Sequence, residues 1–526
     1  MAKLELGRHF NITHGLLDTQ LERGLETHVA YRCYNPDSAR PQVTYGELAD
    51  LANQVGNGLK ELCVQPEQRL AILQNDSIEA VACLLGAIRI GAIPVVLNTM
   101  LKPDKLQFIL QDSRAVCLIA EDDFLSDLPD LSSSLPHLRA IVVRGRSKTG
   151  QTDFEDLVTS NSPKLEPFRS FCDEVAVWQY TSGTTGTPKG VMHTHRQIVF
   201  SAQTFFAELL DLAPKDLTYC VSKLFFGYGQ GNSVWGPLWH GSSVLLFPGR
   251  PTPDRVVEIV QTCKPTVLFA APTHYSKILH TPELAGFDCS SLRLCMSAGE
   301  ALPPTIYEEW KERFGLEILD GIGSTEAFHV FIANRPGQVR PGSSGKPLNG
   351  YETKILSREG EPVPVGKEGV LHVKSESIAI GYWNNYEKPK ATFVGEWLKT
   401  GDIYRLDEDG YHWYCGRADD IFKTGGVWVS PIEVENALRE HEAVKEAGVV
   451  PFINSETLQK GMAYIVLRDG CRGSEELAKE LKDFVKTQVE PYKRPELIRF
   501  VEDLPRTTTG KIQRNILKDM AKNDSE

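Results

Sequence analysis

Fully apolar stretches alternate with helix-length segments along the first 300 residues of the chain. These apolar stretches stand at residues 70–73, 95–97, 140–143, 243–247 and 266–270. Strands that are apolar at every position are covered on both faces, which is typical of parallel sheets flanked by helices. Segments such as residues 48–62 have the length of the intervening helices. The pattern therefore predicts an α/β body.

The pattern changes after Gly342 to short, partly alternating strands that are separated by turn signals. We expect strands at residues 351–356, 369–374 and 410–414. Such alternation is typical of a small antiparallel barrel or sheet. We place this β-rich subdomain at about residues 342–418, as the last part of an N-terminal domain of residues 1–418.

A compact α+β unit is expected in the last part of the chain, at residues 419–526. The segment Ser430-Pro-Ile-Glu433 has the form of a capping box with proline at the first helical position. It opens a helix whose apolar side would hold Ile432, Val434, Leu438 and Val444. A second helix would begin at Ser474 and end before Pro491, with strands at residues 463–467 and 497–501.

Composition and charge exclude several classes of protein. The chain has 526 residues, enough for at least two domains, and its 57 basic and 69 acidic side chains give a net charge of 57 − 69 = −12. This balance offers no basic surface for nucleic acid. The most apolar segment, residues 78–97, contains Glu79, Arg89 and Pro94, so we expect no membrane insertion. Eleven cysteines without a C-x-x-C pair favour reduced thiols and a cytoplasmic location.

The segment QYTSGTTGTPKGV, residues 179–191, places glycines and hydroxyl groups beside a single lysine. Its apolar flanks argue against a linker, so a loop that wraps an anion is the alternative to an ordinary surface loop. It fails the phosphate-loop template G-x-x-x-x-G-K-[ST], because Pro188 precedes Lys189 and Gly190 follows it. Backbone N–H groups, hydroxyls and an ammonium nevertheless suit a polyphosphate.

Further stretches carry candidate chemistry. Residues 297–302 and 320–326 each follow a strand-like run and place small residues where a flat ring could approach the backbone. Glu326 is a hard oxygen ligand of the kind that magnesium prefers. Asp402 offers a carboxylate for a ribose diol, and Arg417 and Lys511 supply cations. Taken singly, each of these features is more often a turn or a solvated side chain.

Taken together, these motifs closely resemble the core motifs of the acyl-adenylate-forming superfamily, which includes acyl-CoA synthetases, carrier-protein adenylation domains and luciferases. The matching segments, which span nearly the whole chain, are residues 180–191, 321–326, 400–402, 416–420 and 509–511. Within the superfamily, residues 223–232, 250–253 and 324–331 look most like benzoate–CoA ligases. The resemblance implies an α/β fold: a large N-terminal domain of two parallel-type α/β subdomains plus a small β-barrel, with a mobile α+β C-terminal domain.

The resemblance also implies an ATP-dependent acyl-CoA ligase. Such an enzyme converts a small aromatic carboxylate, benzoate or a related acid, into acyl-AMP and transfers the acyl group to coenzyme A, with release of AMP and pyrophosphate. ATP, Mg²⁺ and coenzyme A would be its cofactor and co-substrates. Two alternatives stay open: an adenylating enzyme that loads a carrier protein, and a catalytically inactive nucleotide-binding relative. A homodimer is possible.

The roles that the resemblance implies fall on matching positions of this chain. Catalysis would depend on Lys511, which would bridge the carboxylate and the α-phosphate, on Thr185, and on Glu326 as the Mg²⁺ ligand. The hinge of the mobile domain would be Asp419, and Gly425 and Gly426 would face the pantetheine of coenzyme A. The nucleotide would be bound by Thr181, Ser182, Gly183, Thr184, Gly186, Lys189, Gly299, Glu300, Ala301, Asp320, Gly321, Ile322, Gly323, Thr325, Asp402 and Arg417.

The expected acyl pocket is compact and largely aromatic, which suits a flat ring. It would be lined by Phe226, Gly227, Tyr228, Phe328, His329 and Val330. No carboxylate lies between residues 225 and 235 to pair with an ammonium group, which argues against an α-amino acid substrate. Phe226, Phe328 and Val330 could equally be core residues. A substituted benzoate, a heteroaryl acid and a small alicyclic acid all stay open, because apolar pockets discriminate size only weakly.

Overall fold

The structure is a computed structural model. It describes residues 6–35, 38–126, 128, 134–182, 188–281, 286–357, 359–385, 387–418, 420, 422–424, 427–454, 459–506 and 511–524. The chain divides into two compact units, residues 1–352 with 373–398, and residues 353–372 with 399–526. The domain boundary that the sequence places after residue 418 stays a prediction.

The first large sheet of the first unit has the strand order β16-β15-β14-β13-β12-β10-β11-β1-β2. From β1 to β14 along this order, neighbouring strands run parallel, whereas β2, β15 and β16 add antiparallel edges. The strands are β1 (Val29–Cys33), β2 (Gln42–Thr44), β10 (Leu217–Cys220), β11 (Ser243–Leu246), β12 (Val267–Ala270), β13 (Leu294–Ala298), β14 (Ile318–Gly323), β15 (Val330–Ala333) and β16 (Lys346–Pro347).

The second large sheet has the order β19-β9-β8-β4-β3-β5-β6-β7. Its strands from β8 to β7 are parallel, while β8, β9 and β19 pair antiparallel. The strands are β3 (Arg69–Leu73), β4 (Ile93–Val96), β5 (Cys117–Glu121), β6 (Ala140–Arg144), β7 (Thr152–Asp153), β8 (Val175–Ser182), β9 (Pro188–Thr194) and β19 (Gly381–Tyr382). The parallel-type subdomains expected from the apolar runs are thus confirmed, with antiparallel strands at their edges.

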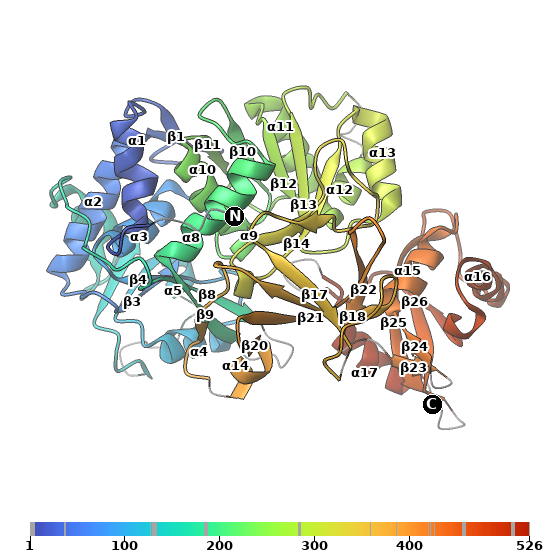
Figure 1. The fold of residues 1–526 in the computed structure, drawn as a ribbon. Helices are drawn as coiled ribbons and strands as arrows, with labels where there is room; N and C mark the ends of the chain where they lie inside the picture. The colour runs from blue at the N-terminus through green and yellow to red at the C-terminus, as the bar shows by residue number, and fades with distance from the viewer. Residues whose placement is uncertain are drawn as a thin grey trace. The chain divides into compact units, whose positions relative to one another are not determined.

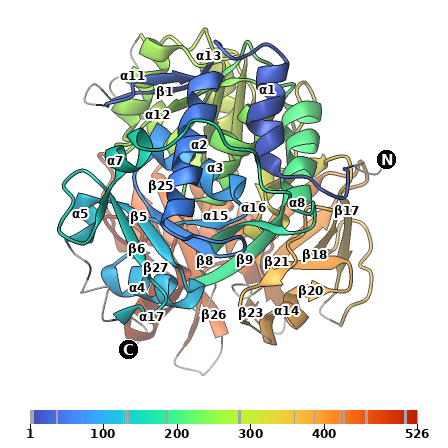
Figure 2. The same ribbon diagram turned by 90° about the vertical axis from the view of Figure 1, so that its left-hand side faces the viewer.

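Helices fill the space between these sheets and cover their outer faces. The helices α2 and α3 lie between the two sheets (Figure 2). The core around them includes Tyr31 of β1 and Ile72 of β3. Residues of α2 (Tyr45–Glu61), α3 (Ile78–Arg89), η1 (His14–Asp18), α1 (Thr19–Glu22), α7 (Phe154–Thr159), α8 (His195–Ser201), η3 (Gly231–Trp235) and α10 (Gly236–His240) belong to this core or pack against it. The helix η2 (Ala202–Leu209) contacts α8 and α10, and α9 (Gly227–Gln230) contacts η3. The outer helices are α11 (Pro253–Cys263), α12 (Pro272–Leu279) and α13 (Pro304–Phe314) on the first sheet (Figure 1), and α4 (Pro103–Ser113) and α5 (Asp122–Leu125) on the second.

A smaller sheet follows in the order β17-β18-β21-β20, and β22 also pairs with β21. The pairs β20–β21 and β21–β22 are antiparallel, as the alternating pattern predicts. The expected third strand at residues 410–414 lies slightly later, as β22. The elements are β17 (Glu352–Leu356), β18 (Glu368–Lys374), α14 (Glu387–Thr392), β20 (Phe393–Val394), β21 (Trp397–Leu406) and β22 (His412–Arg417).

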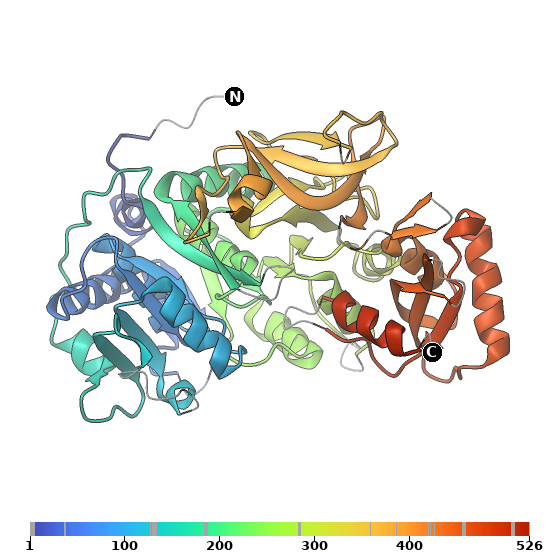
Figure 3. The same cartoon turned by 90° about the horizontal axis from the view of Figure 1, so that it is seen from below.

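The last part of the second unit packs helices on both faces of the sheet β25-β26-β27 (Figure 3). Ser430 caps α15 as expected, but the helix ends at Arg439, and Val444 lies in β25 instead of on the helix. Neither β25 nor α17 was expected from the sequence. The elements are β23 (Phe422–Thr424), β24 (Val427–Val429), α15 (Pro431–Arg439), β25 (Val444–Ile453), β26 (Gln459–Leu467), α16 (Glu475–Gln488), η6 (Pro491–Lys493), β27 (Leu497–Phe500) and α17 (Arg514–Asp524).

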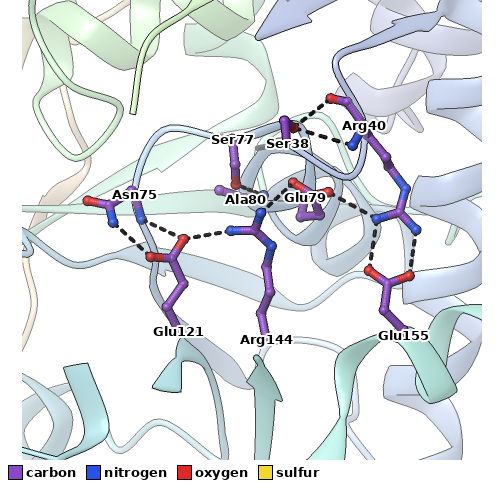
Figure 4. A network of polar contacts seen from close by, with 9 residues as sticks. All are labelled: Ser38, Arg40, Asn75, Ser77, Glu79, Ala80, Glu121, Arg144 and Glu155. Atoms are coloured by element: carbon purple, nitrogen blue, oxygen red, sulfur yellow. Dashed lines mark hydrogen bonds and ion pairs between the residues drawn. The ribbon is translucent and has the colours of Figure 1, made fainter. Parts of the chain in front are cut away.

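A buried ion-pair network ties α3 to its neighbours in the first unit (Figure 4). Glu79 on α3 is only 1% exposed, and its two oxygens lie 3.0 Å from Arg40 and 3.6 Å from Arg144. Arg40 also contacts Glu155 at 2.7 Å, and Arg144 contacts Glu121 at 2.7 Å. Buried charges of this kind are tolerated only when they are paired.

Among the helices of the described residues, none has the length and apolarity needed to cross a membrane.

Candidate active site

The glycine- and hydroxyl-rich segment connects two antiparallel strands. Thr181 at the end of β8 pairs with Lys189 on β9, and Ser182 pairs with Pro188. The template phosphate loop joins a strand to a helix, so the failure of that template has a structural reason. Other predicted members of this segment lie outside the described residues, namely Gly183, Thr184, Thr185 and Gly186.

A tyrosine that the sequence analysis missed stands between the predicted lysine and the predicted metal ligand. The Nζ atom of Lys189 lies 5.3 Å from the ring centroid of Tyr382, within the range of a cation–π contact. The hydroxyl of Tyr382 donates a hydrogen bond of 2.7 Å to Oε1 of Glu326. The strand β19 brings Tyr382 there, because it pairs with β9 opposite Val191. The structure thus gathers Lys189, Tyr382 and Glu326.

The loop that carries Glu326 is held by its own backbone. Ser324 accepts a hydrogen bond from the N–H of Ala327 and so caps the short helix η5 (Thr325–Ala327). Nε2 of His193 lies 2.7 Å from the carbonyl oxygen of Thr325, while burial lowers the pKa of this histidine to about 4. A neutral imidazole therefore donates to the loop at neutral pH. His193, which the sequence analysis did not single out, thus helps to position the loop of Glu326.

The predicted adenine-binding segments lie at the ends of two neighbouring parallel strands, β13 and β14, where Ala298 pairs with Gly321. Gly299 has φ = +96°, a conformation that favours glycine. A Cβ atom at Gly321 would lie 2.7 Å from the carbonyl oxygen of Ile332, so close packing on β15 also requires glycine there. The neighbouring predicted residues Glu300, Ala301, Ile322 and Gly323 belong to the same two segments, and Glu300 accepts a hydrogen bond from Thr273.

Asp320 is a buried carboxyl group within this region. It is 4% exposed, and its Oδ1 atom has no hydrogen-bond partner among the described residues. Burial raises its pKa to about 8, although the N–H of Leu302, 3.4 Å from Oδ2, opposes the shift. The side chain therefore carries a proton at neutral pH and adds no negative charge to this segment.

Aromatic rings surround the predicted pocket histidine, His329. The ring of Tyr228 stacks on it with centroids 5.7 Å apart and planes 18° apart, and Phe205 and Phe206 lie at 4.8 and 5.1 Å. His329 is 3% exposed, and burial lowers its pKa to about 3, so the ring is neutral. Within the described residues, neither ring nitrogen has a hydrogen-bond partner. Phe205 and Phe206 were not predicted, because they lie in an apolar run typical of a core.

The other predicted pocket residues have different surroundings. The ring of Phe226 contacts Phe225, and Phe328 packs against His193 and Trp235 in the core between the sheets. Phe328 has φ = +68°, which is a strained backbone conformation for a bulky residue. Val330 is buried in β15, and a Cβ atom at Gly227 would contact the amide oxygen of Gln179.

The remaining predicted residues belong to the second unit. Arg417 on β22 donates to Asp402 on β21 with a bond of 2.8 Å, and the two residues pair directly in the sheet. The predicted ribose-binding residues are thus adjacent. Lys511 is exposed shortly before α17. The predicted hinge Asp419 and the predicted pantetheine-binding Gly425 and Gly426 lie outside the described residues.

Two family domains match most of the chain. The AMP-binding enzyme family matches residues 20–383, and the AMP-binding enzyme C-terminal domain matches residues 433–511. The first match alone covers more than half of the chain. The chain belongs to the AMP-binding enzyme family.

Relatives of this AMP-binding enzyme are similar over almost their whole length. A 4-hydroxybenzoate–CoA/benzoate–CoA ligase of Rhodopseudomonas palustris is 39% identical over 517 residues, 98% of this chain and 94% of that protein. A benzoate–CoA ligase of Thauera aromatica is 40% identical over 90% of this chain and 89% of its own. The crystal structure of the anthranilate CoA ligase AuaEII with anthranoyl-AMP has a TM-score of 0.92, 41% identity and 99% coverage of both chains.

Proposed function

We propose that this AMP-binding enzyme is an ATP-dependent acid–thiol ligase that activates a small aromatic carboxylate and joins it to coenzyme A. The observation that carries the proposal is the neutral aromatic group of Tyr228, His329, Phe205 and Phe206 in the same unit as Lys189 and Glu326. Relatives named as benzoate, hydroxybenzoate and anthranilate CoA ligases support the same activity.

The first half-reaction overcomes the poor reactivity of a carboxylate. Its oxygen attacks the α-phosphate of ATP, the bond to the β-phosphate breaks, and pyrophosphate leaves with acyl-AMP as the product. Lys189 binds the β- and γ-phosphates, the segments 299–301 and 321–323 frame the adenine, and Asp402 with Arg417 binds the ribose. The ammonium of Lys511 stabilises the charge that develops between the carboxylate and the α-phosphate.

Glu326 has the chemistry that a magnesium ligand needs. Its Oε1 atom accepts the hydroxyl of Tyr382, and among the described residues its Oε2 atom accepts no hydrogen bond. A carboxylate oxygen is a preferred ligand of Mg²⁺, which usually also binds substrate phosphates. When it is bound, Mg²⁺ neutralises part of the negative charge of the triphosphate.

In the second half-reaction the thiol of coenzyme A attacks the carbonyl carbon of acyl-AMP, AMP leaves, and a thioester forms. We assign the hinge between the two steps to Asp419 and the contact with pantetheine to Gly425 and Gly426.

The substrate acid is benzoate or a ring-substituted benzoate, because a neutral aromatic pocket accepts a flat ring and offers no charge to an ammonium group. We also propose that the enzyme is cytoplasmic, consistent with its free cysteines, and that a homodimer is a possible assembly.

A substrate panel tests this function. Purified protein is incubated with ATP, Mg²⁺ and CoA or a carrier protein, together with aromatic, alicyclic and fatty acids, and the products are identified by mass spectrometry. Aryl-CoA formation from benzoate-type acids is the expected result. Aryl thioester on the carrier protein alone would favour the carrier-loading alternative. Nucleotide binding without pyrophosphate exchange for any acid would overturn the proposal in favour of an inactive relative.

A further inference from the structure

The strand β19 joins two parts of the site that lie far apart in sequence. On either side of Tyr382, the N–H of Ile380 donates to Met192 and the N–H of Trp383 donates to Gly190, both on β9. One residue earlier, the N–H of Ala379 donates to the carbonyl oxygen of Glu326 at 2.8 Å. The segment 379–383 is therefore bonded both to the lysine-bearing strand and to the loop of Glu326.

The side chain of Tyr382 is fixed within this arrangement. It is 7% exposed and packs in a small apolar group with Val191, Ala379 and Phe393. A ring held in this way has few alternative rotamers, so its hydroxyl and its face keep fixed directions. The hydroxyl points at Oε1 of Glu326, and the ring lies beside Nζ of Lys189.

Two opposite charges, Lys189 and Glu326, thus share one aromatic residue. An ammonium and a carboxylate that both contact one side chain attract each other, and a direct pair between them would occupy both groups before a nucleotide arrives. The tyrosine offers each of them a separate interaction: a hydrogen bond for the carboxylate and a cation–π contact for the ammonium.

We propose that Tyr382 is a positioning residue for the magnesium–nucleotide complex. Its hydroxyl holds Oε1 of Glu326 so that Oε2 faces the cation, and its ring keeps Lys189 from pairing with Glu326. This inference rests on the proposed function, because it concerns the same nucleotide site. Residues that orient a metal-binding carboxylate typically change metal affinity by about 10–100-fold when they are replaced.

The test measures metal binding directly instead of turnover. Mn²⁺, which reports on the Mg²⁺ site, is titrated into the protein with a non-hydrolysable ATP analogue and followed by electron paramagnetic resonance. Tyr382→Phe keeps the ring but removes the hydroxyl, so we expect Mn²⁺ to bind about ten-fold more weakly while metal-free ATP analogue binds as in the wild type. Tyr382→Leu removes the ring as well, so metal-free binding of the analogue should also weaken.

Tyr45→Phe is the matched control, because Tyr45 is fully buried in the first unit and its hydroxyl donates to the backbone of Ser242, at 2.9 Å. It should leave Mn²⁺ affinity unchanged. Melting temperatures of all variants show whether each is folded. Equal Mn²⁺ affinity in wild type and Tyr382→Phe would overturn the inference alone. Failure of the wild type to bind Mn²⁺ with the ATP analogue would instead overturn the proposed function.

Discussion

At the scale of single residues, Gly231 is a position where the proposed acyl pocket leaves no room for a larger side chain. A Cβ atom there would lie 2.2 Å from Cδ2 and 2.4 Å from Nε2 of His329. The histidine cannot move away freely, because Tyr228 and two phenylalanines pack against it. We expect Gly231→Ala to displace the ring and to lower kcat/KM for the aromatic acid by about 100-fold, since displacements near 1 Å can have effects of that size.

Pyrophosphate exchange at varied acid concentration measures this effect, and calorimetry measures ATP affinity, which should be retained. The comparison variant is Gly227→Ala, whose Cβ atom would lie 3.1 Å from the flexible end of Gln179. It should reduce kcat/KM much less. Two results would argue against the pocket that we assign to His329. One is a loss of kcat/KM of the same size in both variants, and the other is a loss of ATP affinity in Gly231→Ala as large as its loss of kcat/KM.

Asp320 predicts a pH dependence of stability with a definite sign. Its folded pKa is about 8, because of burial, while the ordinary value is 3.8. Between these values the folded protein holds a proton that the unfolded chain has released, so this group makes stability fall as pH rises. The contribution of Asp320 to the free energy of unfolding is fully present below about pH 4 and is lost as the pH rises through about 8.

Asp320→Asn keeps the size of the side chain and removes the titration. Melting temperatures measured by circular dichroism from pH 5 to pH 8 should therefore fall less steeply in the variant than in the wild type. The other titrating groups are common to both proteins, so the difference in slope belongs to residue 320. Parallel curves for the two proteins would show that Asp320 is already ionised in the folded state.

At the scale of elements, the ion-pair network around Glu79 holds α3 against its neighbours. Replacing Arg40 by Met leaves the buried carboxylate with Arg144 alone, at 3.6 Å. Removing one partner of a buried charge typically lowers the free energy of unfolding by about 3–5 kcal/mol. We expect a loss near 3 kcal/mol, because Arg144 still pairs with Glu79. Glu155→Gln removes a half-exposed partner of Arg40 and should cost under about 1 kcal/mol. Urea unfolding midpoints separate the two variants, and similar midpoints would contradict a structural role for the network.

The elements that the sequence predicts well are those whose burial is uniform. The strands β3, β11 and β12 are buried almost throughout, and the structure places them near the expected positions. The strand β25 escaped prediction because Lys445, Glu446 and Pro451 interrupt its apolar pattern. Its place is decided by long-range pairing with β26, which no local pattern reveals.

The same distinction explains which site residues could be found. Lys189 and Glu326 lie in unusual local runs of glycine and hydroxyl residues, so the sequence points to them directly. Tyr382 lies 56 residues from Glu326, and only the pairing of β19 with β9 brings it to the site. Phe205 and Phe206 look like core residues in sequence, and only the position of His329 gives them a second role.

At the scale of the whole molecule, the predicted functional groups are divided between the two units. Lys189, Glu326 and the aromatic pocket belong to the first unit, whereas Asp402, Arg417 and Lys511 belong to the second. In the proposed function, Lys511 stabilises the charge that develops at the α-phosphate while acyl-AMP forms. Lys511 is assigned to the first half-reaction alone, so the two half-reactions should depend on it to different extents.

Lys511→Ala is therefore expected to lower the rate of acyl-AMP formation by about 100- to 1000-fold, the usual cost of one group that stabilises a developing charge. Thioester formation from supplied acyl-AMP and CoA should keep most of its rate, because the proposed role of Lys511 ends when acyl-AMP has formed. Rapid-quench measurements of each half-reaction test this difference. Lys522→Ala, at a lysine that is 75% exposed on α17, is the control and should leave both rates unchanged. An equal loss of rate in both half-reactions for Lys511→Ala would contradict this role. Lys511 would then support the fold or both steps alike, and would have no specific part in adenylation.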